Sequence, residues 1–139
     1  MLTWIVKWLL RRAYRAVNSG NIEPVLRMMA EDVRFVFPGT SSWAGEYRGK
    51  AEVRRFLSRV VDHGLQYEVH DILLKGPPWN MVGVVLVSDR ACDADGRVTY
   101  ENRALEYCRG SWGRLRSLEV FEDTEKSAAW DRLLAQGRA

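Results

Sequence analysis

The chain has 139 residues, of which 47% are hydrophobic and 28% are charged, so a packed core is expected. This composition excludes intrinsic disorder, collagen-like repeats and coiled coils, and the longest apolar run is too short to cross a bilayer. The net charge is +3, but residues 1–20 hold four basic side chains and no acidic one, while the rest hold 17 basic and 18 acidic ones. Because the remaining arginines are interspersed with acids, we expect no nucleic-acid partner.

The N-terminal segment predicts an amphipathic helix that ends at a glycine, Gly20. The helix has an apolar face and a second stripe of tryptophan and arginine. The apolar face carries Leu2, Ile5, Val6, Leu9, Ala13, Ala16 and Val17, and the second stripe carries Trp4, Trp8, Arg11 and Arg15. One interpretation is a core helix whose tryptophans cover a pocket mouth or a dimer contact. The other is a basic helix lying on a membrane surface. We favour the core helix and expect no membrane partner.

Turn residues and hydrophobic periodicity predict the remaining elements. A second helix begins near Pro24 and ends at Met29, and a strand over residues 32–37 is followed by a loop that holds Trp43. Apolar residues at helical spacing predict a third helix over residues 50–63. Four strands follow over residues 65–75, 81–92, 98–109 and 114–121, and a short helix over residues 127–136 ends the chain. This order is typical of a single α+β domain spanning residues 1–139.

The turn at residues 93–96 determines which side chains share a face of the long hairpin around it. A loop of four or two residues makes the numbers of paired residues sum to 189 or 191, which are both odd. Odd-numbered residues before the turn then share a face with even-numbered residues after it, so Asp89 lies on the same face as Asn102, Ala104 and Glu106. A loop of three or five residues would reverse this assignment.

Two further faces follow from the strand pattern. At the turn around residues 110–113, a tight turn places Glu119 on the Glu106 face, whereas a five-residue loop places Val120 and Glu122 there. Both registers stay open from the pattern alone. On the strand over residues 65–75, alternation predicts that Asp71 points inward.

The two cysteines, Cys92 and Cys108, are too few for a disulfide framework. In the predicted hairpin they lie more than about 30 Å apart along the ladder, which is too far for a bridge. We therefore expect two free thiols and a reducing cytoplasm. The sequence has no CxxC motif, no Cys/His cluster and no glycine-rich phosphate loop, so we expect neither a metal nor a cofactor.

Short motifs in a constant order extend from about Leu10 to Trp130. They are residues 16–21 (AVNSGN), 29–33 (MAEDV), 37–38 (FP), 47–50 (YRGK), 69–72 (VHDI), 100–102 (YEN), 113–115 (GRL) and 119–124 (EVFEDT). In these motifs the chain resembles the nuclear-transport-factor-2-like superfamily, specifically its SnoaL-like branch. The resemblance implies a cone-shaped curved antiparallel sheet wrapped around three N-terminal helices, with a short C-terminal helix and a pocket inside the cone. It also implies that even-numbered residues from Asn102 to Glu106 face this pocket, with Val120 and Glu122.

The same resemblance places apolar residues where relatives carry catalytic groups. The general base and the two oxyanion-hole groups of the ketosteroid isomerases fall at Phe37, Ala13 and Ala104. The water-holding side chains of the limonene-type epoxide hydrolases fall at Phe35, Phe37 and Val120. The acid of the hydrolases' Arg-x-Asp pair falls near Asp89. Neither catalytic set is retained, so neither of these two chemistries is expected.

Glu106 is the candidate proton shuttle, with Asp89 as its catalytic partner. Burial in an apolar cone would raise the pKa of Glu106 towards neutrality, which suits proton transfer. The alternative is that Glu106 pairs with Arg103 or turns into solvent, and that Asp89 is balanced by the neighbouring Arg90. The candidate substrate-binding residues are Tyr14, Phe35, Phe37, Trp43, Asn102, Ala104, Val120 and Glu122.

Two functions stay open. The first is a cofactor-free acid–base enzyme of the cyclase or isomerase type, acting on a hydrophobic organic substrate. The second is a non-catalytic ligand-binding or dimerisation module that has lost the catalytic acids of its relatives. Since long strands rarely leave both faces of a sheet in water, we also expect a homodimer.

Overall fold

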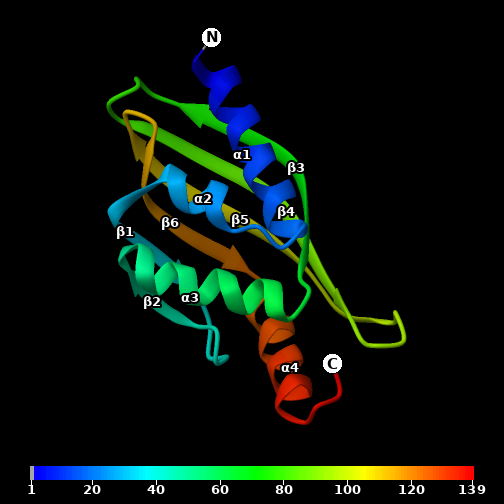
Figure 1. The fold of residues 1–139 in the computed structure, drawn as a ribbon. Helices are drawn as coiled ribbons and strands as arrows, with labels where there is room; N and C mark the ends of the chain where they lie inside the picture. Colours follow the sequence, from blue (N-terminus) through cyan, green and yellow to red (C-terminus); the bar gives the residue numbers. More distant parts are fainter. Residues whose placement is uncertain (1) are drawn as a thin grey trace.

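The computed structural model describes residues 2–139, and Figure 1 shows their arrangement. The elements are α1 (Leu2–Asn18), α2 (Glu23–Met28), β1 (Met29–Phe37), β2 (Gly45–Arg48), α3 (Gly49–Asp62), β3 (Gln66–Lys75), β4 (Met81–Cys92), β5 (Val98–Ser111), β6 (Arg114–Glu122) and α4 (Thr124–Ala135). Every helix and strand expected from the sequence is present. Strand β2 was not expected, because the segment around it has no alternating run long enough to stand out.

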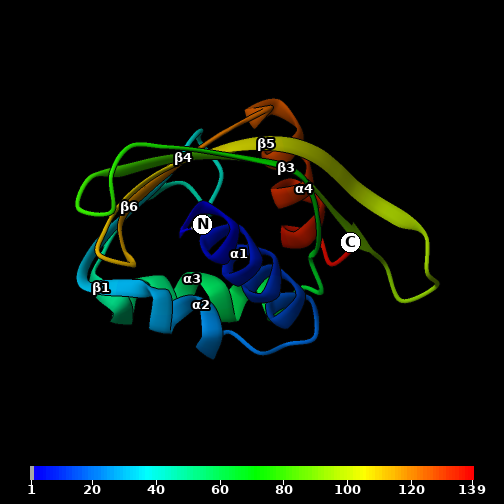
Figure 2. The same cartoon turned by 90° about the horizontal axis from the view of Figure 1, so that it is seen from above.

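The strands form one sheet in the order β2-β1-β6-β5-β4-β3. Its pairs are antiparallel apart from β1 and β6, which are parallel. The sheet is strongly curved, and α1, α2 and α3 lie on its concave side, while α4 lies at the end of β6 (Figures 1 and 2). The expected α+β cone is therefore confirmed.

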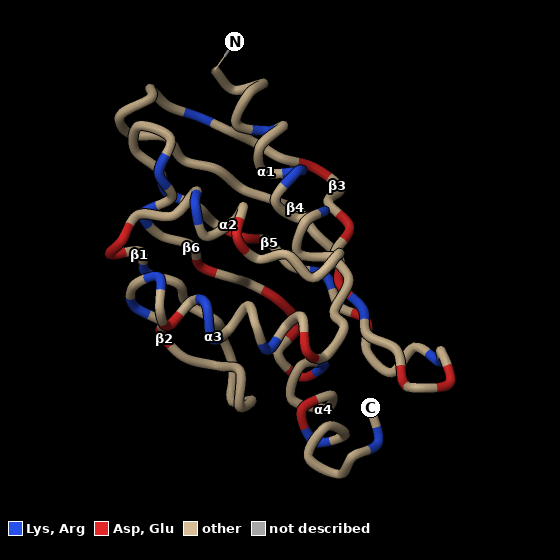
Figure 3. Tube along the Cα trace, viewed as in Figure 1, with Lys and Arg blue, Asp and Glu red and all other residues tan. Residues whose placement is uncertain are grey.

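The helices form where apolar residues recur on one face. In α3, Val53, Phe56 and Val60 are buried at helical spacing. In α1, Ala13 and Val17 are buried, and the helix turns its outer stripe to solvent: Trp4 and Trp8 are 71% and 47% exposed. Among residues 2–139 no helix is both long and apolar enough to cross a membrane. Lys and Arg positions, blue in Figure 3, are spread along the helices and strands and are interspersed with acidic ones.

The β4–β5 hairpin keeps the predicted face for a reason that the sequence pattern does not show. Its tip closes with Asp93 opposite Arg97, a loop of the three-residue kind that by itself reverses the predicted faces. A β-bulge between Ala91 and Cys92 shifts the register by one residue and restores it. Asp89 therefore pairs with Asn102, so the two share a face as predicted.

The β5–β6 hairpin resolves the register that the pattern left open. A two-residue turn at Trp112 and Gly113 has positive φ angles of 52° and 77°, as a type I′ hairpin turn requires. A bulge between Arg109 and Gly110 then shifts the register, so that Glu106 pairs with Val120. Val120 and Glu122 thus share the Glu106 face, and Glu119 lies on the other.

The prediction that Asp71 points inward is wrong. A bulge between Val69 and Asp71 shifts the strand by one residue, so Ile72 is buried and the Asp71 side chain is exposed. Its carboxylate accepts a hydrogen bond from the Ile72 N–H at 2.8 Å.

The prediction of two free cysteines is confirmed: Cys92 is exposed and Cys108 is buried.

Candidate active site

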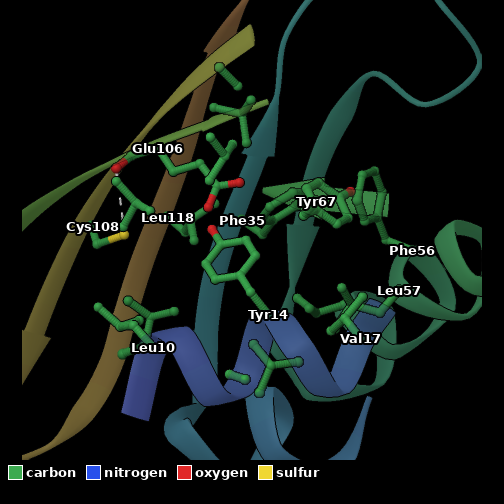
Figure 4. A pocket seen from close by; sticks show the side chains of 18 of the residues that line it. Leu10, Tyr14, Val17, Phe35, Phe56, Leu57, Tyr67, Glu106, Cys108 and Leu118 are labelled. Atoms are coloured by element: carbon green, nitrogen blue, oxygen red, sulfur yellow. Dashed lines mark hydrogen bonds between the residues drawn. The ribbon is translucent and has the colours of Figure 1, made fainter. Parts of the chain in front are cut away.

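An apolar cavity lies between the concave face of the sheet and the three N-terminal helices (Figure 4). The cavity has a volume of about 90 Å³, several times what one water molecule needs. Eight of the ten predicted site residues line it: Tyr14, Phe35, Phe37, Asp89, Ala104, Glu106, Val120 and Glu122. The remaining two, Trp43 and Asn102, do not.

Three carboxyl groups reach this cavity from three neighbouring strands: Asp89 on β4, Glu106 on β5 and Glu122 on β6. The register explains their arrangement, because Ala104 pairs with Val87 on one side and with Glu122 on the other. Asp89 lies two residues beyond Val87, and Glu106 lies two residues beyond Ala104 in the opposite direction, because β4 and β5 are antiparallel. All three acids therefore share one face of the sheet. The small Ala104 methyl group lies between them and leaves the space open.

Glu106 is 9% exposed, and within residues 2–139 its carboxyl group has neither a hydrogen-bond nor an ion-pair partner. Burial, with a smaller contribution from the charge of Glu122, raises its pKa to about 8. The alternative in which Glu106 pairs with Arg103 is wrong, since Arg103 is exposed on the opposite face of the same strand. Figure 4 shows Glu106 and Tyr14 pointing towards one another from opposite sides of the cavity.

Asp89 lies at the polar end of the cavity. Burial raises its pKa to about 6, although its own backbone and the Tyr100 hydroxyl lower it again in part. In the part of the chain that the structure describes, its Oδ1 atom is buried without a hydrogen-bond partner, and Arg90 forms no ion pair with it. Asp89 and Tyr67 also line a polar surface groove, which brings this end of the cavity next to solvent.

Glu122 completes the set, and its pKa is raised to about 7, chiefly by burial and to a lesser extent by the charge of Asp89. Hydrogen bonds from the Ser127 and Tyr100 hydroxyls partly lower it. The Asn102 Nδ2 atom donates to Glu122 Oε2 at 3.1 Å and to the carbonyl of Asp123 at 2.9 Å. Asn102 therefore holds the Glu122 carboxylate by a hydrogen bond from outside the cavity and does not line the cavity itself.

Trp43 is a correction to the predicted site. It is 2% exposed and lies behind the cavity wall, against the Phe56 ring at 5.7 Å and stacked on Trp130 with ring centroids 5.5 Å apart. The Arg59 guanidinium lies 3.9 Å from its ring centroid. Trp130 stacks in turn on Tyr100 at 4.6 Å. This aromatic stack joins α4 to the sheet, so Trp43 stabilises the end of the cone and is not part of the rim.

Tyr67 is a cavity residue that sequence reasoning missed. Its ring meets Tyr14 edge-on at 5.8 Å, and burial raises the pKa of its hydroxyl. Its strand pattern did indicate that it points inward. Its neighbour on the cavity wall, Tyr14, lies 53 residues earlier in the sequence, on a helix, and no local pattern can pair the two. Cys108 was likewise missed: its thiol lines the cavity and burial raises its pKa.

A second apolar cavity, of about 110 Å³, continues from the first towards the N-terminal end of α1. The two share five lining residues: Leu10, Met28, Val85, Cys108 and Leu115. Its far end reaches Pro78 in the β3–β4 loop, whose carbonyl accepts a 2.7 Å hydrogen bond from the Trp112 N–H. The exposed rings of Trp79 and Trp112 lie beside each other there, with centroids 6.0 Å apart.

No group of three or more His, Cys, Asp and Glu side chains in residues 2–139 is arranged to hold a metal ion.

Comparison with known proteins places the chain in a family. An NTF2-like protein of unknown function from Burkholderia pseudomallei has a TM-score of 0.72 at 23% identity, over 88% of this chain and 93% of that one. The epoxide hydrolase/cyclase-like enzyme SalBIII, which acts in pyran ring formation in the polyether salinomycin, has a TM-score of 0.72 at 16% identity, over 89% and 95%. A putative polyketide cyclase from Xanthomonas campestris pv. campestris has a TM-score of 0.65 at 18% identity, over 91% and 96%.

At these identities the structural likeness shows the fold alone. No match was found among curated proteins. The SnoaL-like domain model, however, matches residues 10–108, which is most of the chain and includes every residue that lines the cavity except those on β6. The protein therefore belongs to the SnoaL-like domain family, within the NTF2-like fold.

Proposed function

We propose that this protein is a cofactor-free acid–base enzyme of the cyclase or isomerase type, acting on a hydrophobic organic substrate. The observation that carries the proposal is the convergence of Asp89, Glu106 and Glu122 on one apolar cavity without a basic partner among the residues that line it. Their pKa values of about 6, 8 and 7 lie on both sides of neutral pH. One group can therefore accept a proton while another donates one.

At neutral pH Glu106 is largely protonated and Asp89 largely ionised, because their pKa values are about 8 and about 6. Asp89 removes a proton from a carbon or hydroxyl group of the substrate, and Glu106 donates its proton to an oxygen or carbon elsewhere on the same molecule. The two acids have then exchanged roles. A proton passes back from Asp89 to Glu106 through solvent at the Asp89 end and restores the starting state, so that the reaction needs no external reagent.

Isotope exchange tests the proposal without knowledge of the product. Hydrophobic ketones and enones are incubated with the protein in D₂O, and deuterium uptake at carbon is followed by mass spectrometry. We expect uptake with the wild type and its loss in Glu106→Gln, with ligand binding retained. The matched control is Glu101→Gln, the same change on the exposed face of the same strand. Uptake in Glu106→Gln at the wild-type rate contradicts the assigned role of Glu106.

A non-catalytic binding module is the second candidate. The observation that favours it is that Ala13, Phe37 and Ala104, which stand where the related isomerases carry catalytic groups, all belong to the cavity wall. Such a module would bind apolar ligands, and neither the wild type nor Glu106→Gln would take up deuterium.

The outer face of the sheet supports a homodimer. Leu86, Leu105 and Phe121 form a row across β4, β5 and β6 and are 37%, 46% and 54% exposed. A second copy covering this row would remove a contiguous apolar surface from water. Light scattering of Leu105→Glu tests this: the variant should be monomeric at concentrations where the wild type is dimeric.

The expected compartment is a reducing cytoplasm, a proposal supported by the two free thiols.

A further inference from the structure

The cavity is unbalanced in charge. It is lined by the carboxyl groups of Asp89, Glu106 and Glu122, and none of the lining side chains within residues 2–139 is Lys, Arg or His. The basic side chains Arg90, Arg103 and Lys126 line the surface groove that Asp89 also reaches, do not line the cavity, and form no ion pair with these acids. An anionic ligand would therefore meet only like charges inside, and a cation would be attracted.

The unmet hydrogen-bonding capacity points the same way. Glu106 is nine-tenths buried, points into the cavity and accepts no hydrogen bond, and the buried Oδ1 atom of Asp89 also has no donor in the described part of the chain. Buried acceptors without a donor are costly, so a ligand that brings N–H groups gains on entering. The carboxyl groups surround Ala104 from three sides, and a primary ammonium has three N–H donors to offer.

The rest of the wall suits the same kind of ligand. Tyr14, Tyr67, Phe35 and Phe56 present aromatic rings to the cavity, and such rings attract a cation as well as apolar surface. From the three acids the space continues past Leu10 and Cys108 into the second apolar cavity. A ligand that fits both parts has a charged head and an elongated apolar body.

We propose that the ligand of this pocket is a hydrophobic primary amine, whose ammonium group lies among Asp89, Glu106 and Glu122 and whose apolar body extends along α1 into the second cavity. The inference rests on the small-molecule pocket of the proposed function and names a class of ligand for it. Because ammonium binding ionises Glu106, the amine is a ligand of the pocket and not the substrate of the proton-donation step. The inference does not rest on turnover, since a binding module with this pocket would select the same ligand.

Three probes with one carbon skeleton and different heads test it: 4-phenylbutylamine, 4-phenylbutanol and 4-phenylbutyrate. Their binding to the full-length protein is measured by titration calorimetry at neutral pH. The amine should bind at least tenfold more tightly than the alcohol, and the carboxylate most weakly. Because ammonium binding ionises the acids, the amine should also release protons, seen as a dependence of the heat on the buffer's ionisation enthalpy.

Variants connect the preference to the three acids. Glu106→Gln and Glu122→Gln should each weaken amine binding at least tenfold while leaving the alcohol within twofold, and Glu101→Gln should change neither. Circular dichroism checks that each variant is folded. Alcohol binding as tight as that of the amine, tighter binding of the carboxylate, or no amine binding would each overturn the inference. The deuterium-uptake assay uses no amine, so it judges the proposed function separately.

Discussion

Replacing the buried acid Glu106 with its neutral isostere should stabilise the protein at alkaline pH. Its pKa is about 8 in the folded protein against an ordinary value of 4.5. Because the folded-state pKa is the higher one, the folded protein binds more protons than the unfolded chain, and stability falls as pH rises from 4.5 towards 8. Between about pH 5.5 and about pH 8.5 this loss is on the order of 3 kcal/mol for the wild type. The Glu106→Gln side chain cannot ionise, so the variant does not lose this stability.

Urea denaturation of both proteins at the two pH values measures the effect. Asp89 and Glu122 titrate in both proteins, so the difference between wild type and Glu106→Gln isolates the ionisation of Glu106. That difference should shift by about 3 kcal/mol in favour of the variant on going from the acid to the alkaline pH. The exposed control Glu101→Gln should show no such shift. Parallel pH profiles for wild type and Glu106→Gln would refute the argument, because they would mean that Glu106 ionises as easily in the folded protein as in the unfolded chain.

Two further predictions follow from the same cavity. Turnover should depend on pH as a bell with limbs near 6 and 8, since Asp89 must be ionised and Glu106 protonated, and a pH–rate profile of the deuterium uptake checks this. A profile that rises through both values would exclude Glu106 as the acid. Ala104→Leu should abolish ligand binding by filling the space between the three acids, with a stability loss of roughly 1–3 kcal/mol from overpacking. Calorimetry measures the binding, and unchanged affinity would place the ligand elsewhere.

Which side chains share a face of the central strands could be predicted from the sequence, but the bulge that makes this assignment correct could not. Parity arithmetic put Asp89, Ala104 and Glu106 together, whereas the loop actually formed at residues 93–97 would by itself have separated them. The bulge at Ala91 and Cys92 compensates. Bulges depend on contacts between strands and have no signature in hydrophobic alternation. The same kind of bulge, at Val69 and Asp71, made the alternation-based prediction for Asp71 wrong.

The candidate site divides in a similar way. Acids and aromatics on the strands could be assigned to the cavity, since strand parity decides which way they point. Trp43 could not be assigned, because its partners, Arg59 and Trp130, come from helices elsewhere in the chain. Tyr67 was missed for the related reason that its partner Tyr14 lies on α1. Local patterns report the direction of a side chain, and only the packed helices show what it meets.

The burial that fits these acids for proton transfer also lowers the stability of the fold. Each raised pKa of Asp89, Glu106 and Glu122 represents free energy that the folded protein lacks at neutral and alkaline pH, in a molecule whose net stability is expected to be about 5–15 kcal/mol. Glutamine at Glu106 would fill the same volume without that loss. A cavity that served only to pack the cone would therefore gain from losing the acid. The acid is useful where a proton must move or a cation must be held, and these are the two roles proposed for it.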